Sequence, residues 1–248
     1  DNVSVMRHGE VVAHSVTADT SKEELAEKMV GRKVRADIEK KLAKVGKATL
    51  VIENVTVRDV YDIAKVNDVS FEVRAGEIVG IAGVSGNGQS ELLQALSGIT
   101  PLTAGRIIIS GPKGSREVTP KQPCDPQEMR RQYIAHVPED RQRLGIVTAF
   151  TAYESAILGY ENDPTIRKGL FFVVDMIRRH CTELMDRFDV RPRLPGIKSA
   201  NLSGGNQQKL LLAREIERGP KVLLVGQPTR GVDIGAVEFI HRQLVELR

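Results

Sequence analysis

A short apolar run followed by a glycine-rich turn constrains this chain more than any other feature. Residues 78–82 read Ile-Val-Gly-Ile-Ala, and Gly83–Ser90 then read Gly-Val-Ser-Gly-Asn-Gly-Gln-Ser. Leucines at helical spacing follow and stop at Gly98. A continuous apolar run is typical of a strand at the centre of a sheet. The order strand, turn, helix predicts an α/β fold in which residues 78–82 form a buried central strand.

The turn has the spacing of a phosphate-binding loop, whose pattern is Gly, four residues, Gly, Lys, then Ser or Thr. Glycines let backbone N–H groups converge on phosphate oxygens, and the start of a helix favours negative charge. Ser90 stands where a hydroxyl would hold Mg²⁺, but Gln89 replaces the lysine. A simple tight turn remains the alternative. The candidate phosphate-binding residues are Gly83, Ser85, Gly86, Asn87, Gly88, Gln89 and Ser90.

A second glycine-containing motif precedes another apolar-periodic segment. Residues 202–209 read Leu-Ser-Gly-Gly-Asn-Gln-Gln-Lys, and Gly219-Pro220 ends the helix predicted from about residue 205. Ser203 can cap this helix, and two adjacent glycines let a backbone or a phosphate approach closely. A well-capped helix without further function is the alternative.

A third motif lacks the acids that phosphate chemistry usually needs. The apolar run 222–225 predicts a buried strand, and Gly226 and Gln227 follow it. Such a strand normally ends in an Asp that holds Mg²⁺, and a Glu next to it would polarise the attacking water. Both carboxylates are missing, so no intact catalytic set is predicted in this chain.

The remaining pattern predicts alternating strands and helices after an N-terminal unit. A hairpin over residues 1–16 turns at His8-Gly9, and a helix begins at Ser21 and stops at Gly31. Further strands are predicted at 49–57, 69–74 and 106–109, and a helix over about 235–247. Residues 150–190 have a helical pattern, with one apolar face made of Ile177, Cys181, Leu184, Met185 and Phe188.

Composition excludes several classes of protein. With 41% hydrophobic and 27% charged residues the chain is globular, and its net charge of +4 is spread along the sequence. Only 4% of residues are aromatic and none is Trp, which disfavours a base-stacking nucleic-acid surface. Cys124 and Cys181 have no disulfide or metal spacing. No apolar run is long enough to span a membrane and no secretory signal opens the chain, which predicts a cytosolic location.

The three motifs, in this order, resemble those of the ATP-binding cassette (ABC) transporter ATPases. Residues 86–93, 138–141, 202–209 and 227–233 are most similar to the second cassette of the double-cassette ATPases of simple-sugar and nucleoside importers. The resemblance implies an α/β P-loop NTPase of ABC type, with a mixed sheet core and a helical signature subdomain at about 150–200. Residues 1–33 resemble the tail of a first cassette, 34–48 a linker, and 49–248 a second cassette that ends before the family's switch histidine; His241 lies in the helix before it.

The resemblance also implies roles for single residues. Tyr61 would lie against adenine, Glu139 would take the place of the Q-loop glutamine, and Asp233 would be the D-loop aspartate, or else the cap of the last helix. The implied cofactors are ATP and Mg²⁺, both weakly bound in this half, with Ser90 as a weak Mg²⁺ ligand. The signature residues that would act on a partner's site are Leu202, Ser203, Gly204, Gly205, Asn206 and Gln208.

The implied function is that of an energy-coupling ATPase subunit of an importer. Hydrolysis would belong to the full-length protein, and this half alone would be inactive or very weak. Residues 158–170 and 187–191 look closer to the nucleoside branch; import of a monosaccharide such as ribose or galactose, a soluble ABC protein without a permease, and a silent regulatory cassette remain alternatives. The implied partners are a first cassette, transmembrane permease subunits and, indirectly, an extracytoplasmic substrate-binding protein, with no nucleic acid. The chain would lie at the cytoplasmic face of the plasma membrane, held there by the permease subunits.

Overall fold

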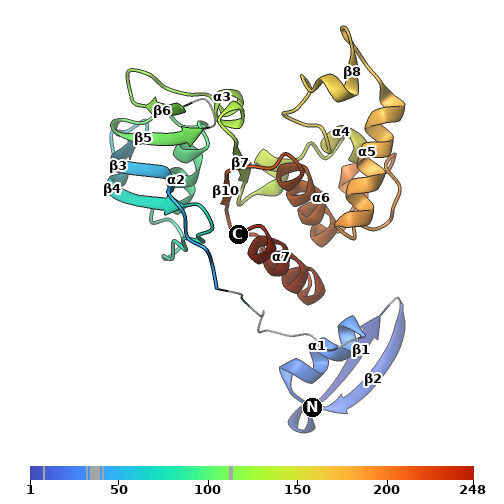
Figure 1. Cartoon of the computed structure of the whole chain (residues 1–248). Coiled ribbons are helices and arrows are strands. Elements are labelled where there is room, and N and C mark those ends of the chain that lie inside the picture. The colour runs from blue at the N-terminus through green and yellow to red at the C-terminus, as the bar shows by residue number, and fades with distance from the viewer. Residues whose placement is uncertain (8, 32, 34–39, 41, 112–113) are drawn as a thin grey trace.

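The computed structural model describes residues 1–7, 9–31, 33, 40, 42–111 and 114–248. Figure 1 shows three parts: a small N-terminal unit, a lobe built on a sheet, and a lobe of helices joined to it by a two-stranded sheet. The sheet lobe carries the glycine-rich loop, and the helical lobe carries the second motif. The two candidate functional segments therefore lie on different parts of the molecule.

The N-terminal unit is a hairpin covered by one helix. Strands β1 (Asn2–Arg7) and β2 (Glu10–Val16) are antiparallel, followed by a short 3-10 turn, η1 (Thr17–Asp19), and helix α1 (Lys22–Val30). Ser21 caps α1 by accepting a hydrogen bond from the backbone N–H of Glu24, and Gly31 ends it at φ 82°. The hairpin and helix predictions are confirmed, although His8 and most of the predicted linker lie outside the described residues.

The sheet lobe is a four-stranded antiparallel sheet in the order β4-β3-β5-β6. Alternate side chains of two central strands face one core, which helix α2 and the short helix α3 cover; Leu50, Ile52, Ile107 and Ile109 are fully buried there. The predicted strands at 49–57, 69–74 and 106–109 are confirmed. The elements are β3 (Ala48–Arg58), β4 (Ala64–Arg74), α2 (Gln89–Leu96), β5 (Ala104–Gly111), β6 (Gly114–Val118) and α3 (Pro126–Arg131).

The prediction of a buried central strand at residues 78–82 is wrong for this structure. The segment has no strand geometry, and Ile78 is 56% exposed. A strand needs a neighbour that takes up its backbone hydrogen bonds, and among the described residues no strand pairs with this segment. Instead β7 (Ile134–Val137) and β10 (Val222–Val225) form a separate parallel pair. Antiparallel and parallel pairing are thus both present, in separate sheets.

The helical lobe packs α5 (Val174–Arg187) against α6 (Gly204–Glu217) and α4 (Ala152–Ser155). Four residues of the predicted apolar face, Cys181, Leu184, Met185 and Phe188, are buried in this core, and Ile177 is buried in a smaller one. Burial raises the pKa of the Cys181 thiol to about 12. Residues 167–172 depart from the predicted helical pattern and form a hairpin, because Gly169 turns the chain at φ 64°. The other elements are η2 (Arg141–Gly145), η3 (Pro164–Ile166), β8 (Arg167–Lys168), β9 (Phe171–Phe172), η4 (Ser199–Asn201) and α7 (Ile234–Glu246).

Candidate functional site

The glycine-rich loop leads directly into the N-terminus of α2. Gly86 and Gly88 have φ values of 91° and 95°, which residues with a Cβ rarely adopt. A Cβ on Gly88 would also lie 2.1 Å from the carbonyl oxygen of Lys65. Residues 83–87 are exposed, so the backbone of the loop is open to solvent at the helix start. This geometry suits an anion, and the phosphate-binding role of the loop stays a prediction.

Gln89 folds back across the loop instead of extending from it. Its Nε2 donates to the carbonyl oxygen of Val84 at 3.3 Å. The same Nε2 lies 1.9 Å from the place that a Cβ on Gly83 would occupy, so the glycine makes room for the amide. A neutral amide therefore fills the space where a lysine would bring a positive charge.

Three polar side chains around the loop donate hydrogen bonds to the carboxylate of Glu139. It accepts hydrogen bonds from Ser90 Oγ at 2.6 Å, from Gln227 Nε2 at 2.8 Å and from Arg230 Nη1 at 2.9 Å. Three residues that the sequence selected separately, Ser90, Glu139 and Gln227, thus meet at one carboxylate. Sequence reasoning missed Arg230; the signal that could have found it is a cation three residues after Gln227.

Gly226 has no space for a side chain. A Cβ there would lie 2.7 Å from Leu93 Cδ2 and 2.9 Å from the backbone nitrogen of Glu139. Its own N–H donates to the carbonyl oxygen of Val137 at 2.9 Å, which holds this backbone in place. An aspartate at this position would therefore require Leu93 or the chain at residue 139 to move.

The residues present make a poor Mg²⁺ site. The hydroxyl of Ser90 and the carboxylate of Glu139 are oxygen ligands of the kind that Mg²⁺ prefers. However, the carboxylate is already taken by a hydroxyl, an amide and a guanidinium, and no second acid stands at position 226. Among the described residues, no group of three or more His, Cys, Asp or Glu could hold a metal ion.

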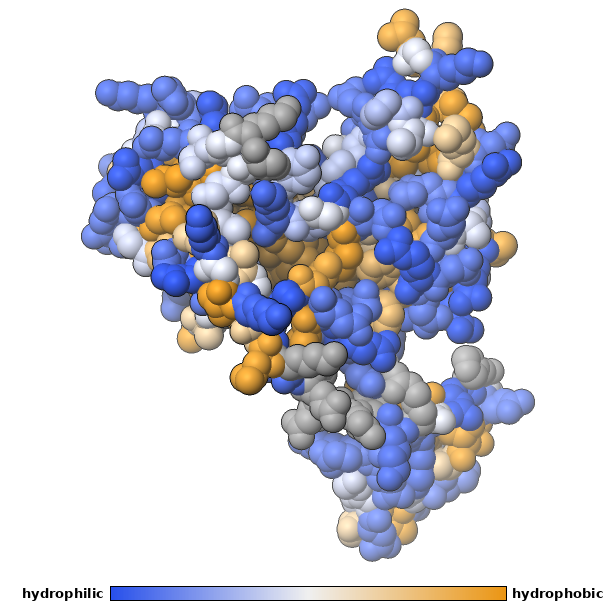
Figure 2. Space-filling view, viewed as in Figure 1, coloured by the Kyte–Doolittle hydropathy of each residue, from blue (hydrophilic) through white to orange (hydrophobic). Residues whose placement is uncertain are grey.

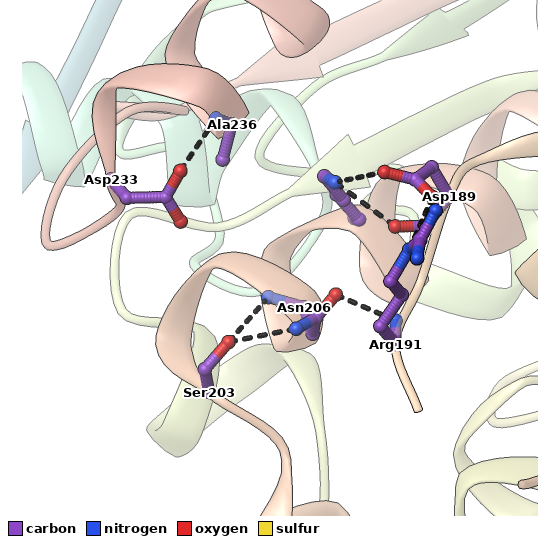
Figure 3. A network of polar contacts seen from close by, with 7 residues as sticks. Asp189, Arg191, Ser203, Asn206, Asp233 and Ala236 are labelled. Atoms are coloured by element: carbon purple, nitrogen blue, oxygen red, sulfur yellow. Dashed lines mark hydrogen bonds and ion pairs between the residues drawn. The ribbon is translucent and has the colours of Figure 1, made fainter. Parts of the chain in front are cut away.

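The second motif forms the N-terminus of α6 (Figure 3). Ser203 Oγ accepts hydrogen bonds from Asn206, from Nδ2 at 2.8 Å and from the backbone N–H at 3.4 Å. Asn206 Oδ1 in turn accepts from the backbone N–H of Arg191 at 2.8 Å. Leu202 is buried beneath the exposed Ser203. The serine oxygen is thus held in place by Asn206 while the residue stays exposed.

Acid–base pairs brace the loop that supports Asn206. Asp189 accepts from Arg191 Nε at 2.8 Å, and Lys209 Nζ lies 3.2 Å from the same carboxylate (Figure 3). Partial burial acts to raise the pKa of Asp189, but its hydrogen bond to Arg191 and the charge of Lys209 outweigh burial and hold the pKa below its usual value.

The two glycines of the motif let the segment before α7 approach closely. A Cβ on Gly204 would lie 2.8 Å from the carbonyl oxygen of Gly231, and one on Gly205 would lie 2.9 Å from Asp233 Oδ2. Asp233 caps α7 by accepting from the backbone N–H of Ala236 at 2.9 Å, which bears out the cap reading of this residue. Its predicted interface role remains a prediction.

Arg141 joins the two candidate regions and was not selected by sequence reasoning as a site residue. Its Nη1 donates to the carbonyl oxygen of Arg230 at 2.9 Å, and its Nε donates to Gln207 Oε1 at 3.3 Å. Among the described residues, no hydrogen bond or ion pair joins the loop at 83–90 directly to 202–206. The loop and the signature of this chain therefore do not face one another as one site.

A buried polar network lies behind the signature helix. Arg214 is 3% exposed and Glu215 is fully buried, and their side chains pair at 2.9 Å. Arg214 Nη1 also donates to the carbonyl oxygens of Gly145 and Ser155, while Tyr160 donates to Glu215 at 2.6 Å. Burial raises the pKa of the Tyr160 phenol above its usual value. This network ties α6 to η2 and to the rest of the helical lobe.

Three other residues noted in the sequence are Tyr61, Gln208 and His241. Tyr61 is 81% exposed in the turn between β3 and β4, so its ring is accessible, and its adenine role stays a prediction. Gln208 is buried, and its Nε2 has no partner among the described residues. His241 lies on the exposed side of α7. Within the described part of the chain, no helix is long and apolar enough to cross a membrane.

Comparison with known families identifies the class of protein. The family profile described as ABC transporter matches residues 66–230, a span that includes the loop, Glu139, the signature and Gln227. This match covers more than half of the chain. The chain therefore belongs to the ABC transporter ATPase family, with the P-loop NTPase fold that its motifs predicted.

Within this family, the chain is similar to curated ATP-binding proteins of importers. The chain is 40% identical to the nucleoside import ATP-binding protein NupA of Lactococcus lactis and to the guanosine import ATP-binding protein NupO of Bacillus subtilis. It is 37% identical to the glucose import ATP-binding protein TsgD13 of Haloferax volcanii. All of this chain is covered in each case, but 48%, 47% and 44% of the relatives. The chain thus spans about half the length of the curated relatives it matches.

Solved structures share the fold. A nucleotide-free ATP-binding cassette of an ABC transporter superposes with a TM-score of 0.64 at 21% identity, over 81% of this chain and 77% of that one. A dimeric cassette in a post-hydrolysis state, bound to ADP and Pi, gives 0.61 at 25% identity, over 79% and 81%. The first likeness supports the fold alone.

Proposed function

We propose that this chain is the part of an importer's ATPase subunit that completes the ATP site of a partner cassette, while its own loop does not support hydrolysis. In this proposal residues 1–33 are the tail of a first cassette, residues 34–48 a linker, and residues 49–248 a second cassette. The observation that carries it is the contrast between Gly226, which has no space for a metal-binding carboxylate, and an ordered signature with an exposed Ser203.

The loop half supports weak nucleotide binding. Replacing the loop lysine by Gln89 removes a charge-assisted contact of about 1.5–3 kcal/mol, which corresponds to a loss of affinity of about ten- to hundredfold. Glu139 is occupied by Ser90, Gln227 and Arg230, and no acid remains to orient an attacking water. ATP and Mg²⁺ would therefore be held weakly here, with Tyr61 against the base.

The signature half supports a role across an interface. The N-terminus of α6 carries partial positive charge and unpaired N–H groups, which favour a phosphate. Ser203 Oγ accepts both of its hydrogen bonds within the chain, so its O–H is available to a phosphate of the partner's nucleotide. Asp233, next to Gly205, would face the same interface. The dimeric relative in a post-hydrolysis state supports such a pairing of cassettes.

The relatives support import of a nucleoside as the coupled transport. Two relatives with complete coverage of this chain are named for nucleoside and guanosine import, at 40% identity. The glucose import relative at 37% keeps a monosaccharide as the second candidate. In either case the partners would be permease subunits, with the ATPase at the cytoplasmic face of the membrane. Uptake of labelled guanosine and labelled glucose by cells lacking the protein would separate the two.

Steady-state ATP hydrolysis by the full-length protein tests the division of roles. We expect Ser203→Arg to lower the rate by about a hundredfold or more, because a bulky cation would block the signature; one lost phosphate donor alone corresponds to about a hundredfold. Gln89→Ala, the matched change in the other half, should alter the rate by less than about threefold. The opposite ranking would overturn the proposal.

A further inference from the structure

The hairpin of β8 and β9 carries an apolar tip on a rigid base. Its strands pair Arg167 with Phe172 and Lys168 with Phe171, and Gly169 makes the turn. At the base, the N–H of Val173 donates to the carbonyl oxygen of Ile166 at 2.9 Å. The Ile166 side chain is buried in a small core with Ile157 and Ile177. The hairpin is therefore fixed to the helical lobe at one end.

The other end presents large apolar side chains to solvent. Leu170 is 87% exposed, Phe171 78% and Phe172 48%. Figure 2 shows hydrophobic atoms standing out at the top of the molecule, at the place of β8 in Figure 1. Figure 1 shows the hairpin projecting from the helical lobe beyond α5, so its tip is convex. Val174 and Met176, in the first turn of α5, continue the exposed apolar surface.

Positive charge accompanies this tip. Residues 166–173 contain Arg167 and Lys168 and no acid. Arg167 is held by a neutral partner, Asn162 Oδ1, at 2.7 Å, so its charge is not compensated there. Of the acids at the base, Asp163 pairs with Arg218, whereas Glu161 accepts from the neutral N–H of Gly159. Asp175 follows the tip, in the first turn of α5.

Two aromatic rings and a leucine beside uncompensated cations match the chemistry of an anionic lipid surface. The apolar side chains can enter the boundary between headgroups and acyl chains, while Arg167 and Lys168 stay at the headgroups. A stable protein interface needs about 800 Å² from each partner, and a convex tip of three side chains fits a lipid interface better. We propose that this hairpin is a membrane-contact site that inserts its tip into an anionic bilayer surface.

Vesicle sedimentation with the full-length protein tests this site. The probes are phosphatidylcholine vesicles and the same vesicles with added phosphatidylglycerol. We expect binding to the anionic vesicles and its weakening at high salt. The double change Leu170→Ser and Phe171→Ser should reduce binding tenfold or more, because the burial of each side chain contributes about 1.5 kcal/mol or more. Leu194→Ser removes an exposed leucine elsewhere in the same lobe and should leave binding unchanged.

The cations are tested separately. Arg167→Gln with Lys168→Gln should reduce the preference for anionic vesicles by about thirtyfold, since each cation near such a surface contributes about 1 kcal/mol. Far-UV circular dichroism and ATP hydrolysis without vesicles should match the unchanged protein in every variant. Equal binding by the tip variant and the unchanged protein would overturn the proposal. So would an absence of vesicle binding, or a changed oligomeric state with unchanged vesicle binding, which would make the tip a contact between copies.

Discussion

The glycine-rich loop and the signature both present the start of a helix to solvent, yet their side chains are engaged in opposite ways. Around the loop, Gln89 folds over Gly83 and Glu139 is surrounded by three donors from the same chain. At the signature, the hydrogen bonds to Ser203 and Asn206 come from within the helical lobe, and Ser203 is exposed. The loop's polar groups satisfy one another, whereas Ser203 of the signature stays exposed.

The segments that hold the two regions in place differ as well. The loop follows residues 78–82, which are exposed and unpaired, while α6 is anchored by the buried pair of Arg214 and Glu215. Buried and satisfied polar groups fix a helix in one position. The comparison indicates that precise positioning is concentrated in the signature half.

The largest expected effect is on stability, from Glu215→Gln. This change leaves Arg214 as a buried charge without its anion, and breaking such a pair destabilises a protein by about 3–5 kcal/mol. In the loop half, Glu139→Gln should change stability by about 1 kcal/mol or less, because Arg230 is mostly exposed. Urea unfolding measures both; equal losses would show that the two regions are equally dependent on their carboxylates.

Acid should destabilise the junction between the lobes through His136 on β7. Burial lowers the pKa of His136 to about 4, with Arg130 and Arg214 acting in the same direction and Glu215 against it. The imidazole is neutral in the fold, so stability falls as the pH drops from about 6.5 to 4, by up to about 3 kcal/mol. His136→Gln should flatten the pH dependence of urea unfolding across this window. An unchanged profile would contradict it.

Gln89→Lys should increase the affinity of the glycine-rich loop for ATP without producing hydrolysis there. The added charge-assisted contact is expected to tighten the weaker of two ATP-binding phases by about ten- to hundredfold, by 1.5–3 kcal/mol. Hydrolysis at this site should not appear, since Gly226 still offers no carboxylate. Titration of the full-length protein with labelled ATP measures the affinity, and Gln122→Lys places the same charge at an exposed position away from the loop. Appearance of ATP hydrolysis at this site in the Gln89→Lys variant would contradict the prediction.

The smallest expected effect comes from Gly226→Ala. The added Cβ would press on Leu93 and on the backbone of Glu139, and such overpacking destabilises by about 1–3 kcal/mol. Gly80→Ala is the matched control, because nothing lies within 4 Å of a Cβ there. We expect a lower urea midpoint for Gly226→Ala and an unchanged midpoint for Gly80→Ala. If Gly226→Ala leaves the urea midpoint unchanged, the backbone at Glu139 can move, and an acidic side chain could fit at position 226.

Sequence reasoning succeeded where structure is local. Ser21, Ser203 and Asp233 cap their helices through N–H groups three residues away. Gly31 and Gly219 end theirs at positive φ. The apolar face of α5 follows from the 3.6-residue period alone. Caps and helical faces depend on neighbours within about four residues, so the amino-acid sequence by itself determined them, and the motif order determined the family.

Tertiary structure decided the features that join distant segments. Ser90, Gln227 and Arg230 lie 49, 88 and 91 residues from Glu139, and no local pattern assigns them to one carboxylate. Residues 78–82 are apolar enough for a buried strand, yet a strand exists only where another strand accepts its hydrogen bonds. The blocked space at Gly226 likewise depends on where Leu93 packs. The chain's sequence thus determined which residues are present for phosphate chemistry, and packing decided which of them are free to perform it.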